Sequence, residues 1–141
     1  LSIVGGDLLV ETLALLEEGR LSPEKQDETL ATYAPIIKKE DGIIDWSKPA
    51  RNIRNLVRGM LPWPGAYTSL GGKMLKVFGA AVSEGRGKPG EVIRSGGGIL
   101  RVATGEGVLD VLELQIEGGK RLETAAFLAG RKIPEGAILG A

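Results

Sequence analysis

Residues 66–116 read AYTSLGGKMLKVFGAAVSEGRGKPGEVIRSGGGILRVATGEGVLDVLELQI. In this stretch, short runs of aliphatic and β-branched residues alternate with glycine clusters, a pattern typical of strands joined by turns. It predicts five strands, at residues 66–70, 74–82, 91–94, 98–104 and 108–116. The alternation slips near Leu112, which predicts a bulge in the last strand. Five short strands suit a small barrel of the oligonucleotide/oligosaccharide-binding (OB) type, with a β-sandwich as the alternative.

Helices are expected on both sides of these strands. Residues 48–59 carry apolar side chains at helical spacing, with Ser47 as the N-cap and Pro49 tolerated in the first turn. A second, short helix is expected at residues 123–129, after the last strand. The predicted fold class is therefore mainly β with flanking helices.

The N-terminal part of the chain differs in character from the rest. Residues 3–18 predict an amphipathic helix that ends at Gly19, and the polar stretch after it predicts an extended linker. The chain begins with a leucine in apolar sequence, so we expect it to be a piece of a longer protein. We divide it into a helix at 1–19, a linker at 20–40 and a domain at 41–141.

The composition of the chain leaves little room for catalysis. There is no cysteine and no histidine, which excludes disulfides, thiol chemistry and the commonest general base. Glu40, Asp41 and Asp45 lie on an extended segment that does not bring their carboxylates together, so neither a catalytic pair nor a metal site is expected. The glycine-rich run at residues 85–90 is followed by a strand-like stretch and is expected to be a hairpin loop, not a dinucleotide site. We find no signal peptide and no apolar run near the roughly 20 residues of a membrane span, so a cytoplasmic protein is expected.

The charged residues are unevenly distributed. The net charge is zero, yet residues 48–101 hold ten basic residues against two acidic ones, a balance of +8. This asymmetry favours an anionic partner. Arg51, Arg54 and Arg58 are spaced three and four apart, which places them on one face of the predicted helix, where guanidinium groups match phosphate geometry. The alternative is an ordinary solvated helix face.

Two further pairs of basic residues are candidates for phosphate contact. Lys120 and Arg121 lie in a loop that leads to the last helix, and Lys73 and Lys76 lie in a predicted hairpin.

Both tryptophans are expected in the core. Trp63 lies between two prolines, which suits a rigid turn that directs the indole between the helix and the first strand. A stacking platform for an unpaired base is the alternative for Trp63. Trp46 has the same core interpretation.

Short motifs along almost the whole chain resemble one family. They are TYAP at 32–35, KEDGIIDWSKPA at 39–50, PWPGAY at 62–67, ATGEG at 103–107, LQ at 114–115, GKR at 119–121 and FLAG at 127–130. In this order they resemble the C-terminal portion of the methionyl-tRNA formyltransferase family. Ile36 stands where the family usually has a lysine, which leaves Lys38 or Lys39 to take over its role.

The resemblance implies an enzyme that transfers a formyl group from 10-formyltetrahydrofolate to initiator methionyl-tRNA. Residues 1–19 would be the final helix of a truncated catalytic domain, and residues 41–141 an OB-like tRNA-binding domain. This fragment alone would be inactive and would hold no cofactor or metal of its own. Its partners would be initiator methionyl-tRNA and its own N-terminal catalytic domain, without a membrane.

The alternative is a structural module of a related formyltransferase that acts on sugar nucleotides. For the tRNA-binding interpretation, the predicted contact residues are Lys38, Lys39, Arg51, Arg54, Arg58, Lys73, Lys76, Lys120 and Arg121.

Overall fold

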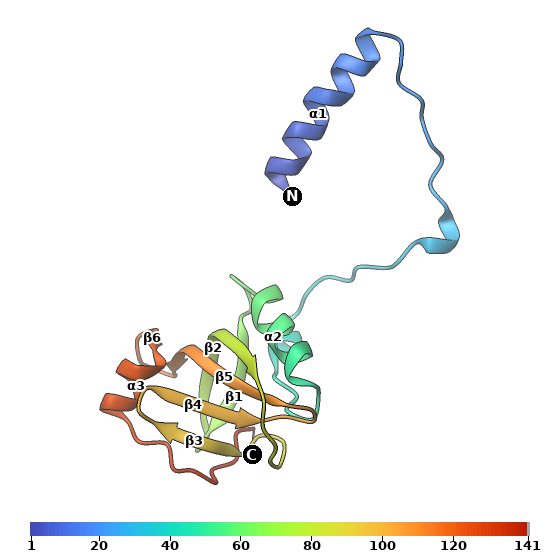
Figure 1. The fold of residues 1–141 in the computed structure, drawn as a ribbon. Helices are drawn as coiled ribbons and strands as arrows, with labels where there is room; N and C mark the ends of the chain where they lie inside the picture. The colour runs from blue at the N-terminus through green and yellow to red at the C-terminus, as the bar shows by residue number, and fades with distance from the viewer. Residues whose placement is uncertain (141) are drawn as a thin grey trace. The chain divides into compact units, whose positions relative to one another are not determined.

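The computed structural model describes residues 1–140. The chain forms two compact units, Leu1–Pro35 and Ile36–Ala141, whose boundary falls inside the predicted linker (Figure 1). Each unit is described by itself.

The first unit contains the helix α1, Ser2–Glu17. Its end is capped as predicted, because Gly19 adopts a φ of 67° and the amide of Arg20 donates to the Leu15 carbonyl at 2.9 Å. The amphipathic pattern expected for α1 is wrong: the successive residues Leu8, Leu9 and Val10 are all exposed, and at about 100° per residue they point to three sides of the helix. A helix that is apolar on all sides is typical of a buried core position. The expected linker is extended except for a short 3₁₀ turn, η1 (Glu28–Leu30), and for its last two residues, which begin a second 3₁₀ turn.

The second unit is built on one antiparallel sheet. Its strands are β1 (Ala66–Leu70), β2 (Lys73–Ser83), β3 (Val92–Gly96), β4 (Ile99–Ala103), β5 (Val108–Ile116) and β6 (Leu122–Glu123). They follow the order β1-β2-β5-β4-β3, and β6 pairs with β5. The five predicted strands are confirmed to within two residues at each end, whereas the two-residue strand β6 was not predicted.

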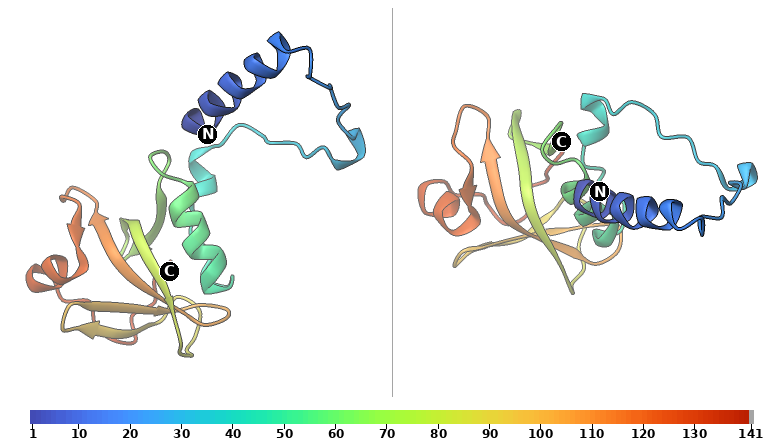
Figure 2. Two further views of the ribbon diagram at one scale, coloured as in Figure 1. Left: turned by 45° about the horizontal axis from the view of Figure 1, so that its top comes forward. Right: turned by 90° about the horizontal axis from the view of Figure 1, so that it is seen from above.

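A register slip bends the longest pair of strands. Val77 lies opposite Leu114 and Ala80 opposite Val111, and Gly79 lies opposite Glu113 between them. The bulge predicted near Leu112 is thereby confirmed. A bulge increases the local twist, which helps β2 and β5 curl around the core (Figure 2).

The sheet stops short of the closed barrel expected from the sequence. Within the described residues, the strand ladder ends at β1 on one side and at β3 on the other. The C-terminal segment 136–140 lies between these two edges: the amide of Leu139 donates to the Gly90 carbonyl at 2.8 Å, and that of Gly140 donates to the Ser69 carbonyl at 3.0 Å. Irregular backbone therefore bridges the gap that a further strand pairing would close.

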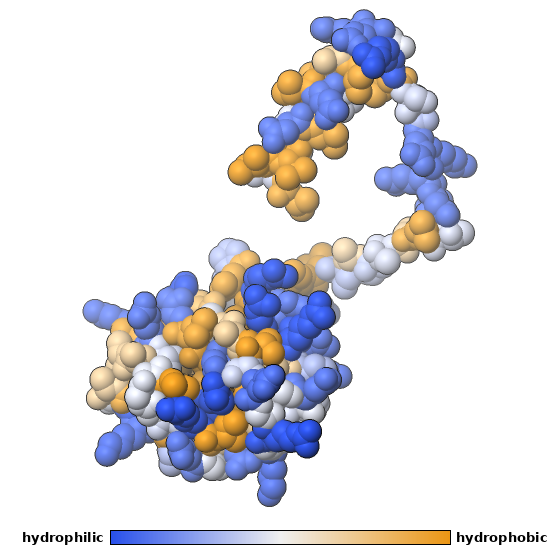
Figure 3. Space-filling model, in the orientation of Figure 1, coloured by the Kyte–Doolittle hydropathy of each residue, from blue (hydrophilic) through white to orange (hydrophobic). Residues whose placement is uncertain are grey.

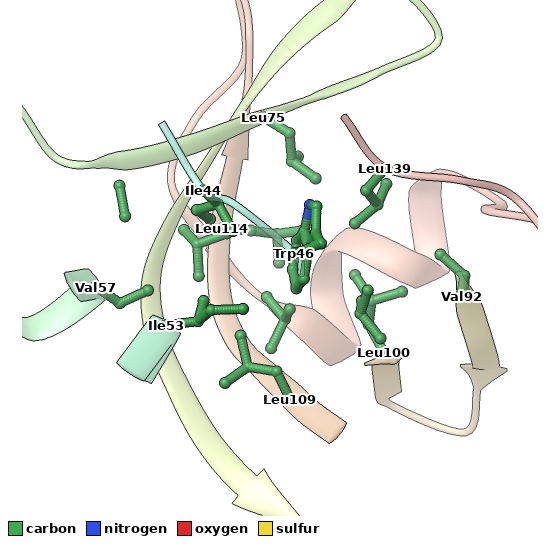
Figure 4. Packing of buried hydrophobic residues seen from close by; sticks show 14 of the residues in the cluster. Ile44, Trp46, Ile53, Val57, Leu75, Val92, Leu100, Leu109, Leu114 and Leu139 are labelled. Carbon is green, nitrogen blue, oxygen red and sulfur yellow. The ribbon is translucent and has the colours of Figure 1, made fainter. Parts of the chain in front are cut away.

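The helix α2, Ala50–Gly59, packs on β2 and β5. It begins two residues later than predicted, and the expected Ser47 cap is wrong because the Ser47 hydroxyl donates to the Asp45 carboxylate at 2.6 Å. Ile53 and Val57 face the core, as Figure 4 shows.

The core is mainly aliphatic, with one tryptophan at its centre. Trp46 is 5% exposed, and its indole Nε1 donates to the Thr68 hydroxyl at 3.0 Å, which confirms its predicted position (Figure 4). The predicted short helix is also confirmed as α3, Thr124–Gly130, with Phe127 buried.

Candidate nucleic-acid interface

The arginine row of α2 lies on solvent. Arg51, Arg54 and Arg58 are all exposed, whereas Ile53 and Val57 on the same helix are buried. The helix contains no acidic residue, and in residues 1–140 none of the three arginines forms an ion pair. Figure 3 shows strongly hydrophilic side chains over α2 on this face of the unit. The row therefore offers guanidinium groups whose hydrogen-bond donors are available to an anion.

Lys38 and Lys39 lie beside the end of α2. Lys39 opens a 3₁₀ turn, η2 (Lys39–Gly42), that the sequence did not predict, and the amide of Lys38 donates to the Asp41 carboxylate at 2.7 Å. A side chain at Gly42 would collide with the Gly65 carbonyl, so the turn packs tightly against the loop that follows α2. Both lysines are exposed and lack an ion pair in the described part of the chain.

Lys73 and Lys76 lie on β2 beside a carboxylate. Lys73 is exposed and lines a cleft of about 430 Å³ together with Tyr67, Met74 and Glu117. Lys76 is half-buried on the neighbouring stretch of the strand. The Glu117 carboxylate accepts a hydrogen bond from the Met74 amide at 3.2 Å, which keeps a negative charge close to both lysines. The local potential is therefore weaker here than over α2.

Arg121 is held by other residues of the chain. Its Nε donates to the Glu113 carboxylate at 2.6 Å, a second bond joins the same groups, and the guanidinium lies 4.4 Å from the centre of the Phe78 ring. The hydrogen bond from Arg121 lowers the pKa of the Glu113 carboxyl, and Glu113 in turn raises the pKa of Arg121. A phosphate would have to share this guanidinium with Glu113. The neighbouring Lys120 is exposed and forms no ion pair within residues 1–140.

The nine predicted contact residues do not form a single patch. Arg51, Arg54, Arg58, Lys38 and Lys39 belong to α2 and to the turn packed at its end. Lys120 and Arg121 immediately precede β6, which lies across the sheet from α2 in every view of Figures 1 and 2. The α2 group is the larger cluster, and in the described residues none of its five basic side chains forms an ion pair, whereas Arg121 in the other group is paired with Glu113.

Trp63 does not fill the core, so the core position expected for it is wrong. It is 62% exposed on the loop between α2 and β1. The amide of Gly65 donates to the Met60 carbonyl at 2.9 Å, which closes this loop tightly and leaves the indole outside, while Trp46 occupies the centre of the core. The flanking prolines predicted a rigid backbone at Trp63, but they do not determine whether its side chain points into the core or to solvent.

The other expectations concern metals, cofactors and membranes. No group of three or more potential metal ligands occurs among residues 1–140. The glycine-rich run at 85–90 is confirmed as a loop, with the Gly90 amide donating to the Ala103 carbonyl at 2.9 Å. The hairpin expected there is wrong, because the loop connects β2 to β3, and these strands are separated in the sheet by β5 and β4. Among the described helices, none is long and apolar enough to cross a membrane.

Comparisons with known proteins agree with the motifs. The family described as formyl transferase, C-terminal domain, matches residues 36–132. The methionyl-tRNA formyltransferases of Geotalea uraniireducens and Geotalea daltonii are each 56% identical over 140 residues, which is 99% of this chain and 45% of each relative. The chain thus spans slightly less than half the length of these curated relatives.

A solved structure supports the same assignment. HypX from Aquifex aeolicus, in complex with tetrahydrofolic acid, matches with a TM-score of 0.62 and 25% identity over 86% of this chain and 22% of HypX. The resemblance seen in the motifs is confirmed, since the family match covers most of the second unit. The chain belongs to the formyl transferase C-terminal domain family.

Proposed function

We propose that this chain is the tRNA-holding part of a methionyl-tRNA formyltransferase. The single observation that carries the proposal is the row of exposed, unpaired arginines on α2. The identity to methionyl-tRNA formyltransferases over 99% of the chain suggests which anion the row meets. The formyl group would come from 10-formyltetrahydrofolate, and the reacting residues would lie in the part of the enzyme that this chain does not cover.

The arginine row suits a nucleic-acid strand physically. Arg51 and Arg58 are seven residues apart, which is about 10 Å along the helix axis at a rise of 1.5 Å per residue. A row of that length can meet more than one phosphate of the same strand, and each guanidinium can donate two parallel hydrogen bonds. Contacts of this kind position the RNA and do not read its sequence.

The remaining parts of the chain have roles that follow from the same proposal. Residues 1–19, which contain the helix α1, would complete the core of a catalytic domain, because the exposed apolar side chains on several sides of this helix need partners. Residues 20–40 would be an interdomain linker and residues 41–141 the tRNA-binding domain, in a cytoplasmic enzyme. The sheet of this domain, bridged by the C-terminal segment, would be a variant of the OB-type barrel.

A titration of labelled initiator tRNA tests the proposal. The test variant reverses the α2 row as R51E/R54E/R58E. The control variant R94E/R131E/K132E has the same change in net charge, at exposed residues that are remote from the row in sequence and form no ion pair in the described structure. We expect the test variant to lose most of its affinity and the control variant to retain most of it.

Equal losses in the two variants would mean that net charge alone attracts the tRNA. Unchanged affinity in the test variant would favour a structural module instead, whether of this enzyme or of a formyltransferase that acts on sugar nucleotides.

A further inference from the structure

The loop that follows α2 presents an aromatic ring to solvent. Within residues 36–140, Trp63 is the most exposed aromatic residue, since Trp46 and Phe127 are buried and Tyr67 and Phe78 are half-buried. An indole is among the largest apolar surfaces that a side chain can offer, and leaving it in water forgoes the free energy of burying it. The proposed tRNA contacts do not use this ring.

The ring is held on a rigid support. Pro62 and Pro64 fix the backbone φ angles on both sides of Trp63. The hydrogen bond from the Gly65 amide to the Met60 carbonyl closes the loop. Because the loop is already ordered, it loses little conformational entropy when a ligand binds to the indole.

Two segments that carry unpaired cations adjoin the loop. Arg58 lies two residues before Met60, at the end of α2. The η2 turn that begins at Lys39 packs on the loop, since a Cβ at Gly42 would lie 3.2 Å from the Pro64 side chain. The chain contains no acidic residue between Asp45 and Glu84, so α2, the loop, β1 and β2 bring no carboxylate to this region. The η2 turn does carry Glu40 and Asp41, and the Asp41 carboxylate accepts a hydrogen bond from the Lys38 amide.

An exposed indole beside unpaired basic residues complements a nucleotide better than an apolar protein surface. A base offers a π-face to the indole, and its flanking phosphates offer negative charge to the basic residues. An apolar protein surface would bury the indole but would leave the charges of the basic residues without anionic partners.

We infer that Trp63 is a stacking platform for an unpaired base of the bound RNA. In this arrangement Arg58, Lys38 and Lys39 hold the phosphates on either side of that base. The inference rests on the proposed function and adds to it a specific contact with single-stranded nucleotides. An unpaired segment of the tRNA would then bind at the C-terminal end of α2. The other arginines of the row would contact phosphates of either a paired or an unpaired segment.

Tryptophan fluorescence of the full chain tests the inference directly, because the chain has only two tryptophans. Trp46 is buried and hydrogen-bonded to Thr68, so it serves as an internal reference. We expect an oligouridylate of about 12 nucleotides to quench the emission of the wild-type chain as it binds. In Trp63→Phe, which keeps an aromatic ring but removes this emission, the signal from Trp46 is expected to stay constant.

Affinity measurements with Trp63→Leu separate stacking from charge. Stacking of a base on an aromatic ring contributes about 1–3 kcal/mol, so we expect the affinity for the oligouridylate to fall about 5- to 150-fold. The affinity for a blunt RNA duplex with the same number of phosphates is expected to stay unchanged, as is the affinity of Trp63→Phe for the oligouridylate to within a few fold.

Two results would overturn the inference while leaving the proposed function standing. One is binding of the oligouridylate and of initiator tRNA without any change in emission. The other is a Trp63→Leu chain that binds single-stranded and duplex RNA as well as the wild type does, which would assign the ring to a protein contact. If the wild-type chain bound no tRNA at all, the proposed function would fail and the inference would fail with it.

Discussion

Neutralising the arginine row of α2 should change how the affinity for tRNA depends on salt. The perturbation is the triple substitution R51Q/R54Q/R58Q, which removes three charges and keeps side chains that are long and polar. Because the three residues are exposed and lack ion pairs within the described structure, we expect the free energy of unfolding to change by less than about 0.5 kcal/mol per site. Any loss of binding then reflects the interface and not the fold.

The magnitude follows from counterion release. Each phosphate contact contributes about −0.9 to the slope of log K against log salt for a duplex, so three contacts contribute about −2.7. Between 50 and 200 mM salt, this part of the slope corresponds to about a 40-fold loss of affinity in the wild type that the triple variant should not show. The slope of the variant should therefore be shallower by between two and three.

Fluorescence anisotropy of labelled initiator tRNA, measured across this range of salt, provides both slopes. The matched control is R94Q/R131Q/K132Q, which removes the same charge from exposed residues outside the predicted contact set. A triple α2 variant whose slope equals that of the wild type would refute the assignment of these arginines to phosphates, even if its affinity at one salt concentration were lower.

Three further predictions concern the fold that supports this surface. Leu139→Ala should lower the free energy of unfolding by about 2–5 kcal/mol in a urea titration, because the side chain is 2% exposed and anchors the segment that bridges the sheet edges; a loss below about 1 kcal/mol would contradict this role. Gly105→Ala should cost about 1–3 kcal/mol in the same assay, since the new Cβ would collide with the Ser47 carbonyl, and an unchanged midpoint would show that the backbone yields freely. The hydrogen bond from Arg121 lowers the pKa of Glu113 in the folded state. The ionised Glu113 therefore stabilises the fold at pH values above its pKa in the unfolded chain, and this stabilisation is lost as the pH falls through its pKa in the folded chain. Stability measured from pH 6 down through the acid range should therefore fall less steeply in Glu113→Gln than in the wild type, and parallel curves would argue against this coupling.

The sheet was predictable from local patterns. The strands β1 and β5 begin and end where the alternation of side chains and the flanking turns predicted, and the slip near Leu112 predicted the bulge. These features depend on residues close together in the sequence, because a strand with one buried face must alternate.

The parts that were mispredicted or missed depend on contacts between distant residues. The bridging role of segment 136–140 comes from backbone hydrogen bonds to β1 and to the residues before β3, and no side-chain period encodes them. The pairing of Arg121 with Glu113 depends on the register of β5 with the two-residue strand β6. Trp63 is of a residue type that is often buried, yet it is exposed on a loop closed by the hydrogen bond from the Gly65 amide to the Met60 carbonyl.

The candidate site was predicted only in part, because some of its features depend on local spacing and others on contacts between distant residues. Helical spacing was enough to place Arg51, Arg54 and Arg58 on one face of α2. Helical spacing could not predict that Arg121 is hydrogen-bonded to Glu113, or that the η2 turn brings Lys39 close to the end of α2.

A backbone-amide NMR titration with initiator tRNA is the most direct test of where the chain meets RNA. We predict that the largest shifts occur in α2 and in the adjoining turn at Lys38 and Lys39, with small shifts in α3 and in the β3–β4 hairpin. The largest shifts in α3 or in that hairpin, with α2 unaffected, would contradict the assignment of the α2 face to tRNA.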